Sequence, residues 1–203
     1  MLDFSDALVK MPVPAGRRVA ILSWGGGWGV VEADLCERGG LEVAPLPAEA
    51  KEELDALLPS YWSKGNPVDM VGIVNLEHHA RCLEILASSP AFDMVISLGT
   101  VNAATAFGLT ESPEENTVED RELVMARRRY VHEASNRFAA RALELVREHG
   151  KPILAVGMPQ RGAEVGEDGS PQEGLCVYTN PERAARVAAM LAQRAAYLAS
   201  REG

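Results

Sequence analysis

The sequence contains few cysteines and no long apolar segment. Its three cysteines are odd in number and far apart, at Cys36, Cys82 and Cys176. They therefore form neither a disulfide framework nor a metal-binding motif, which indicates a reducing compartment. No apolar run is long enough to span a bilayer, and the first residues lack the basic start and apolar core of a signal peptide. We expect a cytoplasmic protein that does not contact a membrane.

Basic residues and known catalytic motifs are also scarce. Lysine and arginine number 20 against 29 acidic residues, so the net charge of −9 argues against a nucleic-acid partner. There is no Gly-x-Ser-x-Gly motif, and Ser97, the best-placed hydroxyl, cannot be tied to a base by sequence. The four histidines lack the i, i+4 spacing of a zinc helix. We therefore expect no metal site and no catalytic nucleophile.

The remaining sequence alternates apolar runs with helical periods over 203 residues, 47% of them hydrophobic. Strands are expected at 18–23, 41–44, 92–98, 151–156 and 175–178, and helices at 3–10, 28–38, 48–58, 77–87, about 118–149 and 181–199. This order predicts an α/β fold with a doubly wound parallel sheet of about five strands in three layers. We expect residues 1–16 to form a helix and linker, and residues 17–203 to form one domain. Residues 99–118 are expected to be a long loop.

A glycine cluster joins the first expected strand to the helix at 28–38. Gly25, Gly26, Gly27 and Gly29 follow an apolar run directly. Glycines permit a tight turn and the close approach of a ligand, and the start of a helix attracts anions. Two interpretations are open: the cluster binds a phosphate or carboxylate, or it only makes the turn. It is neither a Walker A loop nor a regular G-x-G-x-x-G motif.

Other residues near this turn are candidates for lining a pocket. Trp24 and Trp28 flank the glycines and could cover the turn, pack as core or stack on a ligand. Asn66 and Asp69 lie in a rigid segment, where such residues commonly cap backbone groups or else line a pocket. Ligands of parallel sheets bind beyond the carboxyl ends of the strands, and Ser97 ends one of them. In the helix at 28–38, the spacing of Val30, Val31 and Leu35 predicts an inward-facing apolar stripe.

Several segments together match the sequence patterns of one protein family. Residues 15–31 are similar to the family pattern that ends in Ala-Gly-Gly-Pro-Gly-Val, and Gly65-Asn66-Pro67-Val68-Asp69 is similar to Gly-Asn-Pro-Val-Asp-Leu. Residues 54–59, 150–153 and 179–184 fit in the expected order. The chain thus resembles the NDP-forming acyl-CoA synthetases, which are related to succinyl-CoA synthetase. The resemblance covers nearly the whole chain and matches the family's second flavodoxin-like ligase domain.

The resemblance implies a function in acid–CoA ligation. The family forms an acyl-CoA from an acid, CoA and a nucleoside triphosphate through a phosphohistidine, which two helix N-termini hold. The turn with Gly25, Gly26, Gly27 and Gly29 would be one of those two phosphate sites. CoA and ATP/ADP with Mg would be bound by the complete enzyme, with CoA-binding and ATP-grasp domains or subunits as partners. A homo-oligomer is also compatible with the sequence.

The chain departs from the family at several points. The family's phosphorylated histidine has a Ser-His-Thr-Gly context that does not occur here, and CoA-binding and ATP-grasp segments are absent. We therefore expect the chain to be inert alone. Trp24 and Trp28 replace the family's Asn and Pro, and the loop at 99–118 is longer than usual. A non-catalytic module that senses acyl-CoA or serves assembly is the alternative.

Overall fold

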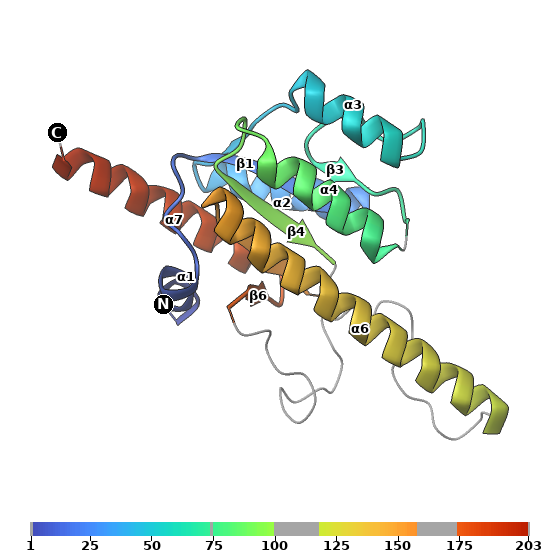
Figure 1. Cartoon of the computed structure of the whole chain (residues 1–203). Helices are drawn as coiled ribbons and strands as arrows, with labels where there is room; N and C mark the ends of the chain where they lie inside the picture. Colours follow the sequence, from blue (N-terminus) through green and yellow to red (C-terminus); the bar gives the residue numbers. More distant parts are fainter. Residues whose placement is uncertain (1, 74, 100–117, 158–173, 203) are drawn as a thin grey trace.

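Strand β1 (Arg18–Ser23) pairs with three other strands, β2, β3 and β4. The structure is a computed structural model, which describes residues 2–73, 75–99, 118–157 and 174–202. All pairings are parallel and give the order β2-β1-β4-β5-β6, with β3 also paired to β1 (Figure 1). The other strands are β2 (Glu42–Val43), β3 (Val68–Asp69), β4 (Met94–Leu98), β5 (Ile153–Val156) and β6 (Cys176–Tyr178). This order confirms the predicted flavodoxin-like sheet.

Strand β3 is the one described strand that the sequence pattern did not predict. It is two residues long and lies within the turn-rich segment at 65–72. It pairs with Leu22 and Ser23 at the end of β1, whereas β2 pairs with Arg18 and Val19 at the beginning. The two short strands therefore share one edge of β1, one after the other. A strand of two residues has too little periodicity to be recognised in a sequence.

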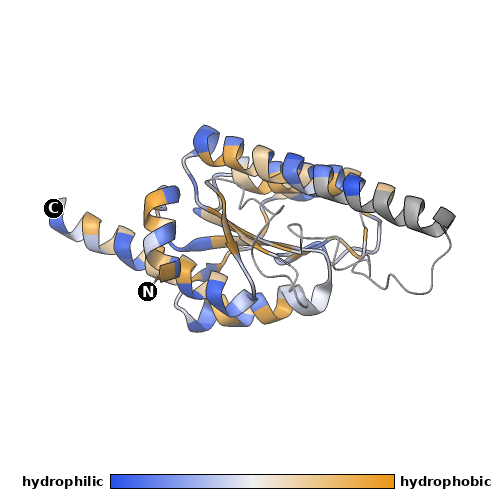
Figure 2. Cartoon of the chain, turned by 90° about the horizontal axis from the view of Figure 1, so that it is seen from below, coloured by the Kyte–Doolittle hydropathy of each residue, from blue (hydrophilic) through white to orange (hydrophobic). Residues whose placement is uncertain are grey.

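Helices cover both faces of the sheet (Figure 2). Helix α2 packs against α7, and α4 packs against α6. The central strands are buried on both sides, which explains their continuous apolar sequences. The helices are α1 (Leu2–Lys10), α2 (Gly26–Arg38), α3 (Ala48–Leu57), α4 (Leu76–Ser88), α6 (Val118–His149) and α7 (Pro181–Glu202). Most of the predicted loop at 99–118 lies outside the described residues.

The N-terminal helix α1 joins the same core. Ala7 is fully buried, and Met11 just beyond the helix is also buried in the main hydrophobic cluster. Arg183 of α7 donates a hydrogen bond to the carboxylate of Asp3, which ties the two helices together at the surface. Within the described residues, no helix is long and apolar enough to cross a membrane.

Candidate functional site

The glycine turn is the point where β1 becomes helix α2. Gly25 is extended, with φ −146° and ψ 137°, and it is the N-cap of α2. The helix therefore begins at Gly26, two residues before the predicted start at Trp28, so Gly26 and Gly27 are helical rather than part of a loop. Its first intrahelical bonds run from the N–H groups of Trp28 and Gly29 to the carbonyl of Gly25, at 3.1 and 3.3 Å. The N–H groups of Gly26 and Gly27 precede these bonds and point out of the helix end.

The three glycines of the first turn have different surroundings. A Cβ added to Gly26 would lie 2.8 Å from a carboxylate oxygen of Asp69, and one on Gly29 would lie 3.0 Å from Pro67. A Cβ on Gly27 would meet nothing within 4 Å. Gly26 and Gly29 are therefore small because the neighbouring segment packs on them, whereas Gly27 faces open space. The open side of the turn is the side from which a ligand has access.

Asn66 is a structural residue of the sheet edge. Its side-chain amide donates to the carbonyls of Val19 and Ala44, both at 2.8 Å, and its oxygen accepts from the N–H of Ile21 at 2.9 Å. Val19 and Ile21 belong to β1 and Ala44 directly follows β2, so the amide lies where the pairing of β1 with β2 ends, before its pairing with β3 begins at Leu22. The side chain of Asn66 thus replaces a missing strand residue, which is the backbone-capping role.

Asp69 places a carboxylate beside the start of α2. One of its oxygens accepts from the N–H of Val71 at 2.8 Å, and the other lies against Gly26. Val71 has φ +52°, a left-handed conformation that is unfavourable for a β-branched residue. The segment is held there because the N–H of Met70 donates to Ser23 and that of Gly72 donates to Trp24. The carboxylate of Asp69 is therefore fixed on one side of the turn.

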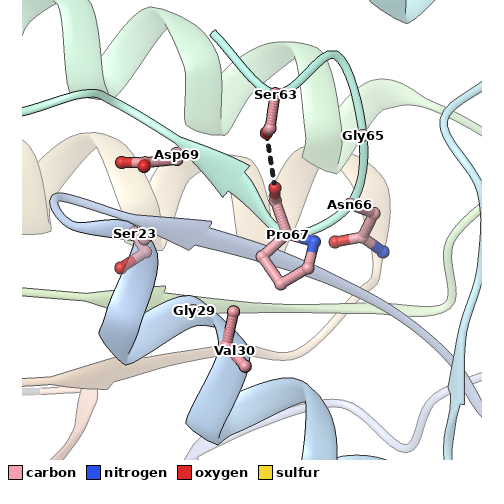
Figure 3. Close-up of a pocket in the computed structure, with 9 residues that line it drawn as sticks. Ser23, Gly29, Val30, Ser63, Gly65, Asn66, Pro67 and Asp69 are labelled. Carbon is pink, nitrogen blue, oxygen red and sulfur yellow. Dashed lines mark hydrogen bonds between the residues drawn. The ribbon is translucent and has the colours of Figure 1, made fainter.

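A cavity of about 200 Å³ lies between the first turn of α2 and the segment at 63–69 (Figure 3). Two of the predicted pocket residues, Asn66 and Asp69, line it together with Gly26 and Gly29. Trp24, Trp28 and Ser97 do not line it. The cavity contains one carboxylate and no basic side chain, the remaining lining residues being Ser23, Val30, Ser63, Gly65 and Pro67.

The predicted inward stripe of α2 is wrong for Val30 and Val31, whereas Leu35 is partly buried against the core. Val30 and Val31 are 67% and 53% exposed, and the buried residues of the helix are Gly29, Glu32 and Cys36. This face of the helix is turned inward because Gly29 packs closely against Pro67 and Ser23. Burial raises the pKa of Glu32 to about 8, and the thiol of Cys36 is its hydrogen-bond partner at 3.7 Å. The carboxyl is therefore neutral at pH 7.

Ser97 has a histidine neighbour that the sequence analysis did not connect to it. The hydroxyl of Ser97, at the end of β4, lies 3.1 Å from Nε2 of His79 on α4, and both residues are fully buried. The signal for His79 was present in its spacing, because it lies in one helical stripe with Cys82, Leu83 and Leu86. Burial lowers the pKa of His79 to about 3, so its ring is neutral.

The two tryptophans beside the turn are partly buried and pack against the hydrophobic core. Trp24 lies edge-on to the ring of His79, with ring centroids 6.1 Å apart. The described residues contain no cluster of three or more His, Cys, Asp or Glu residues that could hold a metal ion. The polar groups at the turn are therefore the first backbone N–H groups of α2 and, on the side of Gly26, the carboxylate of Asp69.

Comparisons with known proteins show what the chain is similar to. The chain is 32% identical over 195 residues to the ADP-forming acetate–CoA ligase II subunit alpha of Pyrococcus furiosus, covering 96% of the chain. This chain is a relative of the ADP-forming acyl-CoA synthetases. The resemblance expected from the sequence is thereby confirmed. No family model matches the chain.

Solved structures show the same fold. A crystal structure from Pyrococcus horikoshii OT3 matches 96% of the chain with a TM-score of 0.68 and 26% identity. The dinucleotide-forming acetyl-coenzyme A synthetase 1 of Ca. Korarchaeum cryptofilum, in complex with phosphate and ADP, matches 98% with a TM-score of 0.67 and 20% identity. The chain spans 37% of the length of the P. furiosus subunit and 39% and 38% of these two structures.

Proposed function

We propose that this chain is a domain or subunit of an ADP-forming acid–CoA ligase and holds the phosphate of a phosphohistidine at the start of α2. The observation that carries the proposal is the open side of the glycine turn, where Gly27 has free space and the first N–H groups of the helix point outward. Similarity to an ADP-forming ligase subunit over 96% of the chain supports the wider assignment.

The role of the turn would be electrostatic. The N–H groups of Gly26 and Gly27, with the positive end of the helix dipole, would stabilise a transferred phosphoryl group without any covalent step on this chain. The carboxylate of Asp69 occupies the side of Gly26. The phosphoryl group would therefore approach from the side of Gly27, where it avoids repulsion by that carboxylate.

The remaining chemistry would come from other parts of the enzyme. A cavity of about 200 Å³ is smaller than usual ligand pockets of about 300–1,000 Å³, so it does not accommodate CoA. We propose that the histidine, CoA and the nucleotide with Mg are held by CoA-binding and ATP-grasp domains or subunits. The chain would be inert without them.

Thermal unfolding with and without phosphate tests the proposal. Phosphate at a hundred times its dissociation constant stabilises the folded state by about 2.7 kcal/mol, which raises Tm by roughly 5–10 °C. Gly27→Leu places a side chain on the open side of the turn and should abolish the shift. Val31→Leu, on the exposed face of the same helix, should leave it unchanged.

CoA provides the second arm of this experiment. A shift with CoA and none with phosphate would favour the alternative function, a non-catalytic module that senses acyl-CoA. A phosphate shift that persists in Gly27→Leu would show that the anion binds elsewhere. No shift with either ligand would contradict phosphate binding by this chain alone.

A further inference from the structure

His79 is a fully buried polar residue with no part in the chemistry described above. Its ring lies between two aromatic side chains in edge-on contact, Trp24 at 6.1 Å and Phe138 of α6 at 5.3 Å between ring centroids. Its Nε2 is paired with the hydroxyl of Ser97, and its Nδ1 is buried without a hydrogen-bond partner. Burying a ring nitrogen without a hydrogen bond is unfavourable, so an apolar residue at this position would make the folded state more stable.

The contacts of His79 lead directly to the glycine turn. Trp24 is the residue before the N-cap Gly25, and its carbonyl accepts from the N–H of Gly72 at 3.2 Å. Trp24 also lies close to Gly99, because a Cβ added to Gly99 would be 3.5 Å from the Cβ and 3.6 Å from two indole carbons of Trp24. Gly99 is left-handed, with φ +91°. The position of the indole is therefore set by His79 and by the chain at Gly99.

We propose that His79 is a positioning residue of the glycine turn: held by Ser97, its ring fixes the indole of Trp24 and so the backbone from which α2 begins. This inference rests on the proposed phosphate site for its functional consequence. The ring does not touch the ligand, and it acts through Trp24. A fixed backbone matters here because donors aimed at a phosphate are effective only when they are held in place before binding.

Backbone amide resonances of Trp24, Gly25, Gly26 and Gly27 test the positioning role without any ligand. His79→Leu should shift and broaden these resonances, and His79→Phe, which keeps a ring against the indole, should restore them at least in part. Leu86→Ala is the matched control, since it removes a fully buried side chain from the same face of α4 two turns away. If His79→Leu disturbs the turn no more than Leu86→Ala does, the proposal is wrong.

The dissociation constant for phosphate gives a second test, because it should not change if His79 only stabilises the fold. We expect His79→Leu to weaken phosphate binding about tenfold, by analogy with the lower end of the effect that removing an outer supporting residue has at metal sites. Leu86→Ala should lower Tm but leave the dissociation constant for phosphate unchanged. Equal dissociation constants in wild type and His79→Leu would refute the functional consequence. If the wild type itself does not bind phosphate, the proposed function fails, and the amide resonances still decide the role of His79.

Discussion

Replacing Asn66 with alanine removes the side chain that joins β1 to its two short partner strands. Three backbone groups, the carbonyls of Val19 and Ala44 and the N–H of Ile21, lose their hydrogen-bond partner. Val19 and Ile21 are fully buried, so water cannot easily replace the amide. At a net value of about 1 kcal/mol for each hydrogen bond, the free energy of unfolding should fall by about 3 kcal/mol.

The corresponding fall in Tm is roughly 6–12 °C for a chain of this size. Thermal unfolding followed by circular dichroism measures it directly. Ser63→Ala is a suitable control, because Ser63 is exposed in the same segment and makes a single long hydrogen bond of 3.4 Å to Pro67. A change within about 0.5 kcal/mol is expected there. If Asn66→Ala is no more destabilising than Ser63→Ala, Asn66 does not replace a strand residue and our reasoning is refuted.

Three further predictions concern α2 and the thiols. Gly26→Ala should destabilise the protein by about 1–3 kcal/mol, because the added Cβ displaces the carboxylate of Asp69. Gly27→Ala should be neutral or stabilise the protein by up to about 1 kcal/mol, because its Cβ meets no neighbour. Equal denaturation midpoints for the two variants would contradict this prediction. The carboxyl of Glu32 has a pKa of about 8 when folded against 4.5 in the unfolded chain, so stability should fall as pH rises between these values, by at most about 1.4 kcal/mol per pH unit. Glu32→Gln should reduce this slope in denaturation series at several pH values, and an unchanged slope would argue against the neutral carboxyl. Native protein should not react with a thiol reagent until it unfolds, and rapid labelling would be inconsistent with the burial of its three cysteines, Cys36, Cys82 and Cys176.

The fold was predictable because long apolar strands and amphipathic helices alternate without ambiguity. Strand β1 has the bounds expected from its sequence, and the helices at 48–58 and 77–87 differ from the structure by one residue at their ends. Strand β3 was not predictable, because its two residues depend on pairing with the end of β1. The glycine-rich start of α2 was also misplaced, since local sequence favours a loop where the contact between Gly29 and Pro67 sets the packing.

The site was predicted less completely than the fold. The sequence located the glycine turn and brought Asn66 and Asp69 to it, and these residues line one cavity. It could not decide between a structural and a pocket role for Asn66, because the three backbone partners of the amide belong to segments far apart in the chain. The contact between His79 and Ser97 was not predictable either, because it depends on how α4 packs on β4.

Titration of the isotope-labelled chain with inorganic phosphate, followed through its backbone amide resonances, tests the central claim most directly. The account predicts saturable shifts that are largest at Gly26 and Gly27 and absent in Gly27→Leu. Shifts that are absent, or that are centred away from the start of α2, would contradict it.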